Sequence, residues 1–196
     1  MTSTANPSCP ELAQRLINIA RQSAWFMSAL VAVRELGLPS WCIGAGAVRN
    51  LVWDALHESA PSSLADVDVA YFDETATQAH EEELETRLTV MRPHTPWDVK
   101  NQARVHEWFE GHFGYPAQPL LSLEEAVASW PEYVTCVGLT LKADDSIEVI
   151  APYGLDDLFG IVVRHNPVRA SIETYRLRVA QKRYMERWPR VTVVHC

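Results

Sequence analysis

Two aspartates alternate with two valines in the run Asp66-Val67-Asp68-Val69. Side chains two residues apart in a strand point to the same face, so both carboxylates would project together while the valines face a core. Two like charges held this close are unfavourable unless a cation lies between them. Oxygen ligands on a rigid strand suit Mg²⁺. The same short pattern is also common in solvated strand edges and turns, and taken alone it favours that ordinary interpretation.

A third acidic residue could complete a metal-binding set. Asp98 and Glu148 each lie between two apolar residues in a short, strand-like segment. A carboxylate on a strand beside Asp66 and Asp68 would give three ligands for two metal ions, the arrangement that clamps attacking and leaving oxygens in phosphoryl transfer. Asp98 is the preferred third ligand and Glu148 is its rival. Either residue could instead be an ordinary surface position.

A glycine-containing turn, Gly44-Ala45-Gly46, stands between an apolar strand-like segment and a helix-like one. Such a turn exposes backbone N–H groups at a helix N-terminus and lets a phosphate approach closely. Gly44 and Gly46 are therefore candidate nucleotide-binding positions, although such turns are also common without a ligand. Arg49 and Lys100 are candidate phosphate-binding cations, and a solvated helix face is the alternative for each of them.

The elements that would hold these residues can be predicted from periodicity and from turn residues. Helices are expected at about 10–36, 47–57, 75–87, 102–110, 123–130 and 167–188. Strands are expected at 41–43, 66–72, 97–99, 133–141 and 147–151, the last two as a hairpin. Ser122 and Glu125 have the spacing of a capping box before the fifth helix. The chain is expected to form one α+β domain over 1–196, with a core at about 37–165 and a helix at each end.

Two segments taken together resemble a known superfamily. The run 44–51 (GAGAVRNL) followed by 66–69 (DVDV) resembles the DNA polymerase β-type nucleotidyltransferases. Its residue pattern G-x-V-R most resembles that of the CCA-adding and poly(A) polymerase branch. The run 97–106 (WDVKNQARVH) resembles a little-characterised bacterial family of the same superfamily, and that likeness extends over nearly the whole chain.

The resemblance implies a mixed five-stranded sheet and transfer of a nucleoside monophosphate from an NTP to a hydroxyl group. It further implies that Asp66, Asp68 and Asp98 are catalytic and bind Mg²⁺, with Mn²⁺ as a possible substitute, and that Gly44 and Gly46 border the phosphate-binding turn. The sequence departs from the CCA-adding pattern at Asn50, where that branch commonly has Asp, and it has too few residues for a large helical tRNA-binding body.

Charge and composition restrict the class of acceptor that can be expected. The 17 basic and 25 acidic residues give a formal net charge of −8, whereas proteins that grip long nucleic acids usually present a net basic face. A small molecule or a protein is therefore preferred to a large nucleic acid as acceptor. The basic residues concentrate in the expected helix 167–188, which could bind phosphate or an acidic partner, although a solvated face is the default interpretation. The sequence does not indicate an oligomeric state.

The sequence also indicates a compartment. The run 1–9 lacks the pattern of a signal peptide, and the longest apolar run, 24–33, is shorter than a membrane span. Cys42 and Cys136 lie in apolar segments and are expected to be buried, unpaired thiols. A cytoplasmic protein without a membrane partner is expected.

Two other interpretations remain. A Rossmann dinucleotide site would use Gly44 and Gly46, but Arg49 occupies the position of its third glycine, and no series of βα units follows. A catalytically silent nucleotide-binding or protein-interaction module of the same fold is the stronger alternative. The retained acids Asp66, Asp68 and Asp98 argue against a decayed site.

Overall fold

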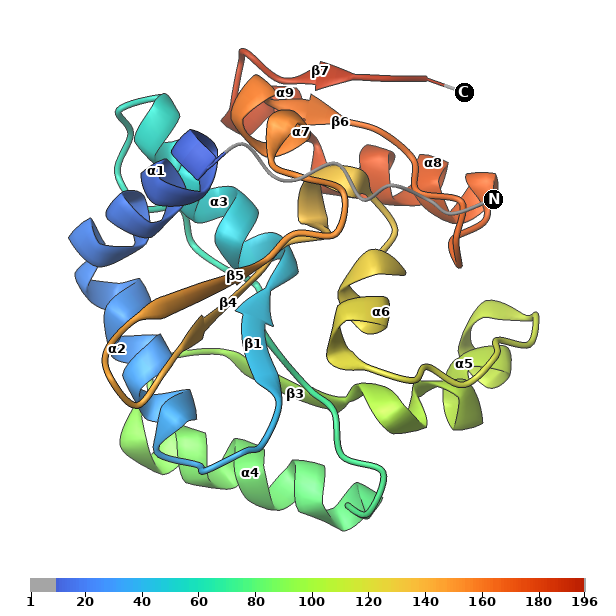
Figure 1. Ribbon diagram of the computed structural model, residues 1–196. Coiled ribbons are helices and arrows are strands. Elements are labelled where there is room, and N and C mark those ends of the chain that lie inside the picture. Colours follow the sequence, from blue (N-terminus) through green and yellow to red (C-terminus); the bar gives the residue numbers. More distant parts are fainter. Residues whose placement is uncertain (1–9, 196) are drawn as a thin grey trace.

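A computed structural model describes residues 10–195 (Figure 1). Within these residues, five strands form a mixed sheet in the order β3-β2-β1-β4-β5. The strands are β1 Trp41–Gly44, β2 Val67–Tyr71, β3 Trp97–Asn101, β4 Gly138–Leu141 and β5 Ile147–Ile150. The α+β fold with a mixed sheet and helices toward both ends of the chain is therefore confirmed.

Strand β2, which carries Asp68 and directly follows Asp66, lies next to the edge of this sheet. β2 pairs antiparallel with β1 and parallel with β3, while β1–β4 and β4–β5 are antiparallel pairs. A parallel pair needs a crossover connection, and helix α4 (Gln78–Met91) supplies it between β2 and β3. The β4–β5 hairpin turns at Asp145, whose φ is 64°. This topology sets Asp98 on the strand beside Asp68.

The N-terminal helix is broken, so the prediction of one continuous helix was wrong. Helix α1 (Pro10–Gln22) and helix α2 (Ala24–Arg34) meet at Ser23 with a bend of 94°. Ser23 is the N-cap of α2, and its hydroxyl accepts a hydrogen bond from the Phe26 backbone N–H at 3.4 Å. Among the described helices, none alone is long and apolar enough to cross a membrane, and α1 with α2 would pass that test only as this bent pair.

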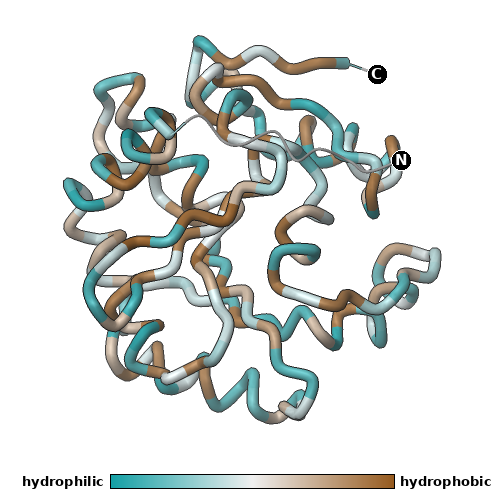
Figure 2. The backbone as a smooth tube through the Cα atoms, viewed as in Figure 1, coloured by the Kyte–Doolittle hydropathy of each residue, from teal (hydrophilic) through white to brown (hydrophobic). Residues whose placement is uncertain are grey.

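One face of the sheet carries the larger hydrophobic core. Ile43, Val69 and Val99 point into it from β1, β2 and β3. Helices α1, α2, α4 and α3 (Ala45–Leu56) contribute further buried side chains to the same cluster. In Figure 2, brown apolar segments run along the central strands, and brown alternates with teal in the surrounding helices. This core makes β2 and β3 a rigid support for the residues on their opposite face.

The other face of the sheet is only partly covered. Cys42 and Ala70 pack there against helix α6 (Leu123–Ala128). Ser122 caps α6 by accepting the Glu125 N–H at 3.1 Å, and Glu125 accepts the Leu121 N–H at 2.9 Å, so the predicted N-terminal cap is confirmed. Because Asp68 is two residues before Ala70, its side chain lies on this second, less covered face.

The C-terminal segment also differs from its prediction. Instead of one helix over 167–188, α8 (Ile172–Lys182) begins after the N-cap Ser171 and α9 (Tyr184–Arg187) follows it. Arg183 separates the two helices because its backbone is left-handed, with φ 48°. Shorter elements complete the described chain: η1 Gln102–Arg104, α5 Val105–Phe113, η2 Tyr133–Thr135, α7 Asp156–Gly160, β6 Val162–Val163 and β7 Thr192–Val193. Residues 133–135 thus form a 3₁₀ turn where a strand was expected.

Candidate active site

Three aspartates meet at one cavity on the less covered face. Asp68 on β2 and Asp98 on β3 are paired residues in the parallel register, and Asp66 directly precedes β2. All three line a cavity of about 190 Å³. The rival acid Glu148 lies on β5, at the opposite edge of the sheet, where it is exposed and forms an ion pair with Lys142. Asp98, and not Glu148, is therefore the acid placed beside Asp66 and Asp68.

Burial and the neighbouring carboxylates raise the pKa of Asp68. Burial and the negative charges of Asp66 and Asp98 together bring the pKa of Asp68 to about 6, although Arg178 and Lys182 lower it. Lys100 forms an ion pair with Asp98 at 2.9 Å between Nζ and Oδ1. Burial lowers the pKa of Lys100, but its hydrogen bond and charge interaction with Asp98 leave that pKa above the usual value. The ionised form of Asp68 is therefore less favourable than that of an ordinary aspartate.

The donor chemistry of this site fits Mg²⁺ when a phosphate ligand is also bound. Among residues 10–195, no three His, Cys, Asp or Glu side chains are arranged to hold a metal ion by themselves. Mg²⁺ does not need such a cage, because it commonly takes one or two carboxylates and completes its shell with water and substrate phosphates. The crowded carboxylate of Asp68 gains from any cation placed among the three acids. The residues present therefore fit a metal–triphosphate complex better than a bare ion.

The two glycines of the segment Gly44-Ala45-Gly46 serve different purposes. Gly44 is the N-cap of α3, and a Cβ there would lie 2.5 Å from Cη2 of Trp130 and 2.9 Å from the Val137 carbonyl oxygen. Gly44 does not line the cavity, and the close packing of Trp130 explains why this position lacks a side chain. Gly46 does line the cavity, and a Cβ there would meet only the Arg49 Nη2 atom, at 3.8 Å. No packing contact or positive φ requires glycine at position 46. The effect of glycine there is to leave open space beside the N-terminus of α3.

Arg49 is buried, so the interpretation that it lies on a solvated helix face is wrong. Its guanidinium carbon lies 5.6 Å from the Trp53 ring, 5.0 Å from the Tyr184 ring and 5.6 Å from the Trp188 ring. Its Nη2 donates to Asn50 Oδ1 at 2.8 Å, whereas its buried Nε has no partner within the described residues. The side chain also lines the cavity, so a caged positive charge faces the three acids.

Two cations of the cavity wall come from the basic helix that the sequence analysis took by default as solvated. Arg178 and Lys182 line the cavity from α8, so a purely solvated face was the wrong interpretation of this basic helix. Their four-residue spacing places them on one helix face, but sequence alone does not tell which face meets the site. Gln102, from η1 after β3, and Trp130 also line the cavity, and neither was among the site residues predicted from the sequence.

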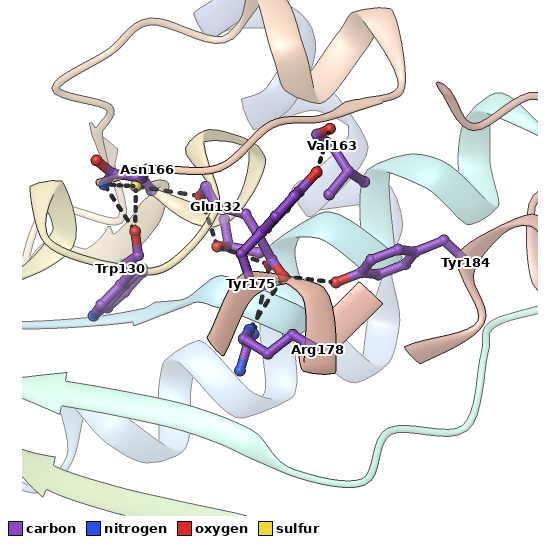
Figure 3. Close-up of polar contacts among 9 residues, drawn as sticks. Trp130, Glu132, Val163, Asn166, Tyr175, Arg178 and Tyr184 are labelled. Atoms are coloured by element: carbon purple, nitrogen blue, oxygen red, sulfur yellow. Dashed lines mark hydrogen bonds and ion pairs between the residues drawn. The ribbon is translucent and has the colours of Figure 1, made fainter. Parts of the chain in front are cut away.

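A buried carboxylate holds Arg178 in place (Figure 3). Glu132 is fully buried, and it accepts hydrogen bonds from Arg178 Nε at 3.1 Å and from the Tyr184 hydroxyl at 3.0 Å. Nearby, the Asn166 side-chain amide donates to the Trp130 carbonyl oxygen at 2.8 Å. A buried ion pair with further hydrogen bonds fixes geometry, because the loss of either partner leaves an uncompensated charge. The network thus orients a cation and an aromatic wall of the same cavity.

A mixed sheet with adjacent strand aspartates facing a helix N-terminus and several cations is the architecture of a polymerase β-type nucleotidyltransferase. The chain belongs to a nucleotidyltransferase family, whose model matches residues 31–193. This agrees with the resemblance found in the motifs GAGAVRNL and DVDV.

Solved structures share this fold. One, described as a CCA-adding enzyme head domain, is 28% identical with a TM-score of 0.79, and the match covers 99% of this chain and 98% of that one. A tRNA-processing enzyme complex is 20% identical with a TM-score of 0.51, and the match covers 85% of this chain but 43% of that one. No curated protein matches the chain.

Proposed function

We propose that the protein is a Mg²⁺-dependent nucleotidyltransferase that moves a nucleoside monophosphate from an NTP to a hydroxyl acceptor. One observation carries the proposal. The in-register pair Asp68–Asp98, with Asp66 beside it, shares a small cavity with four cationic side chains. Carboxylates for a metal and cations for phosphates are the two kinds of group that a metal–triphosphate complex requires. The four cations are Arg49, Lys100, Arg178 and Lys182.

In this proposal, the triphosphate lies over Gly46 and the α3 N-terminus, where the first backbone N–H groups of a helix lack intrahelical acceptors. Asp66, Asp68 and Asp98 hold Mg²⁺, with Mn²⁺ as a substitute. When bound, the metal polarises phosphate oxygens and acidifies the acceptor hydroxyl. Arg178 and Lys182 offset the charge of the phosphates from the α8 side. Arg178 needs little reorganisation to do this because Glu132 already orients it.

The transfer itself exchanges one P–O bond for another. The acceptor oxygen forms a bond to the α-phosphorus as the bond between that phosphorus and the β-bridging oxygen breaks. Pyrophosphate departs with the electron pair, and Lys182 and Arg178 lie where they can offset its charge. The hydroxyl proton passes to the Asp98 carboxylate and from there to water. Lys100, paired with Asp98 at 2.9 Å, keeps that carboxylate oriented toward the cavity.

The preferred acceptor is a small molecule or a protein rather than a large RNA. The formal net charge of −8 supports this preference, because RNA binding draws on broad positive surfaces. The cations described above are gathered in one small cavity. The likeness to a CCA-adding enzyme head domain keeps an RNA 3′ end as the acceptor to be tested against it. The buried, unpaired thiols of Cys42 and Cys136 fit a reducing compartment, which supports action in the cytoplasm.

A catalytically silent nucleotide-binding or interaction module is the second candidate. The observation in its favour is the ion pair between Lys100 and Asp98, which already gives the third acid a cation. The two candidates differ in turnover and not in nucleotide binding. A labelled-transfer assay is therefore the experiment that separates them.

The first test measures thermal unfolding with MgCl₂ and with ATP, GTP, CTP or UTP, singly and together. A ligand that binds only the folded state raises Tm. We expect a rise that needs both metal and nucleotide, that is lost in Asp68→Ala and Asp98→Ala, and that persists in Glu148→Ala. Glu148→Ala is a matched control because it removes a strand carboxylate at the opposite sheet edge. Transfer from α-³²P-labelled nucleotide then tests turnover. A Tm rise that both Asp variants retain would contradict the proposed site.

A further inference from the structure

A second cavity adjoins the candidate active site. It also has a volume of about 190 Å³, and it shares Lys100, Gln102, Trp130 and Pro131 with the first cavity. Four aromatic residues from α5 and the turn that follows it contribute to its remaining wall: Trp108, Phe109, Phe113 and Tyr115. The first cavity is lined by charged groups and the second mainly by apolar ones. A molecule that spans both would therefore place a polar part beside the acids and an apolar part beside the rings.

The aromatic wall is held in place by contacts with the rest of the protein. The Phe109 ring lies 4.4 Å from the Phe113 ring and 5.5 Å from the Tyr115 ring, centroid to centroid. The Tyr115 hydroxyl donates to the Arg169 carbonyl oxygen at 2.6 Å, and the Arg169 guanidinium lies 5.5 Å from the Phe109 ring. Trp108 nevertheless keeps 43% of its surface exposed and Phe113 keeps 37%. Large rings left open to water beside a polar site are typical of a ligand-binding surface.

The position of the second cavity relates it to one reactant. Asp98, Lys100 and Gln102 follow one another along β3 and into η1, and the last two line both cavities. The phosphate-binding side, Gly46 and Arg49, lines only the first cavity. On α8, Thr174 lines the second cavity, whereas Arg178 and Lys182 line the first, so one helix face runs past both. The second cavity thus lies on the Asp98 side of the site, where the proposed reaction activates the acceptor.

We propose that this cavity binds a planar aromatic group of the acceptor, next to the hydroxyl that attacks the nucleotide. The inference rests on the proposed function and adds the chemical class of the acceptor. Rings recognise other rings through edge-to-face and offset contacts, which the Phe109–Phe113–Tyr115 cluster can extend. The size agrees, since a cavity of about 150 Å³ accommodates benzene. A volume of about 190 Å³ takes one aromatic group.

The test uses indole as an aromatic probe and glycerol as a non-aromatic one. The full chain, with and without saturating Mg²⁺ and ATP, is titrated while ¹H–¹⁵N NMR follows the tryptophan side-chain N–H signals. We expect indole, and not glycerol, to shift the Trp108 and Trp130 signals in a saturable way, with a Kd that ATP leaves unchanged within twofold. Absence of a saturable shift overturns the inference. Competition between indole and ATP also overturns it, because the cavity would then hold the nucleobase.

Two variants on α8 make the test specific. Thr174→Trp fills the second cavity from a half-buried position, whereas Leu177→Ala alters an exposed residue of the same helix. We expect Thr174→Trp to raise the indole Kd at least tenfold and Leu177→Ala to leave it unchanged. An unchanged Kd in a folded Thr174→Trp protein refutes the inference. Thermal unfolding of the same samples with Mg²⁺ and ATP distinguishes failure of the proposed function from failure of this inference. If Mg²⁺ and ATP do not raise Tm, the proposed function is overturned. If they raise Tm but indole does not bind, only the proposed class of acceptor is overturned.

Discussion

Replacing each of the two turn glycines by alanine should separate folding from nucleotide binding. At position 44, the new Cβ would lie 2.5 Å from the Trp130 ring and 2.9 Å from a backbone oxygen. Overpacking of this kind costs about 1–3 kcal/mol. At position 46, the nearest atom would be 3.8 Å away, at the end of the Arg49 side chain. Alanine is favoured over glycine by up to about 1 kcal/mol within a helix, and this early helical position has no positive φ.

The two substitutions should change Tm in opposite directions. Because 1 kcal/mol shifts Tm by roughly 2–4 °C for a domain of this size, Gly44→Ala should lower Tm by several degrees and Gly46→Ala should raise it slightly. Gly46 lines the cavity, so its added methyl group should push a bound phosphate away from the backbone N–H groups. A hydrogen bond to a charged group contributes about 1.5–3 kcal/mol, which corresponds to a loss of roughly ten- to a hundredfold in nucleotide affinity.

The assay is calorimetric titration of each variant with ATP in MgCl₂, alongside thermal unfolding without ligand. Gly46→Ala should be slightly more stable than the parent protein but should bind ATP weakly. Gly44→Ala should be less stable and, below its Tm, should bind ATP with an affinity closer to that of the parent. If Gly46→Ala bound ATP with parental affinity, the phosphates would not lie over α3 and the argument for this turn would be wrong.

Three further predictions concern the charged groups around the cavity. Asp98→Asn should lower the pKa of Asp68, now about 6, because it removes one of the negative charges that raise it, and carboxyl ¹³C NMR of the metal-free protein would measure this. A raised carboxyl pKa means that the folded state binds this proton more tightly than the unfolded chain, so the stability contribution of Asp68 falls by up to about 3 kcal/mol as pH rises from about 4 to 6, and by less in Asp98→Asn. Glu132→Gln should lower the free energy of unfolding in urea by about 3 kcal/mol because Arg178 loses its buried partner. The double variant Glu132→Gln/Arg178→Met should recover part of that loss. A loss below about 1 kcal/mol in the single variant would contradict a buried ion pair. Arg49→Lys should cost about 1–2 kcal/mol in the same assay because an ammonium does not stack between three rings, and an unchanged unfolding midpoint would contradict the cage.

Local alternation was enough to predict the acidic face of the site. In Asp66-Val67-Asp68-Val69, the two valines are buried and the two aspartates are partly exposed, as a two-residue period requires. The same rule oriented Asp98 on its strand. Alternation does not tell which strands are neighbours, so Glu148 remained a rival until the sheet order placed it on the opposite edge. Strand order depends on contacts between distant segments, which a local pattern does not contain.

The helix breaks and the cationic wall were harder to predict for two different physical reasons. Ser23 and Arg183 each interrupt a continuous helical periodicity, and neither is glycine or proline, the residues that usually mark such a break. Tertiary packing overrides local propensity at these positions. Arg178 could not be singled out among the basic residues of its helix because its orientation depends on Glu132, which is 46 residues away in the sequence and fully buried. A long-range ion pair leaves no signature in either segment.

The two glycines of the motif have separate structural roles, although the motif reads as a single unit in the sequence. Gly44 admits the Trp130 ring, and Trp130 in turn forms a wall of both the charged cavity and the aromatic one. Gly46 leaves open the space where a phosphate would approach α3. The same short turn therefore sets the position of the aromatic wall on one side and the access of the nucleotide on the other. A substitution at Gly44 should accordingly disturb indole binding more than ATP binding, and a substitution at Gly46 should do the reverse.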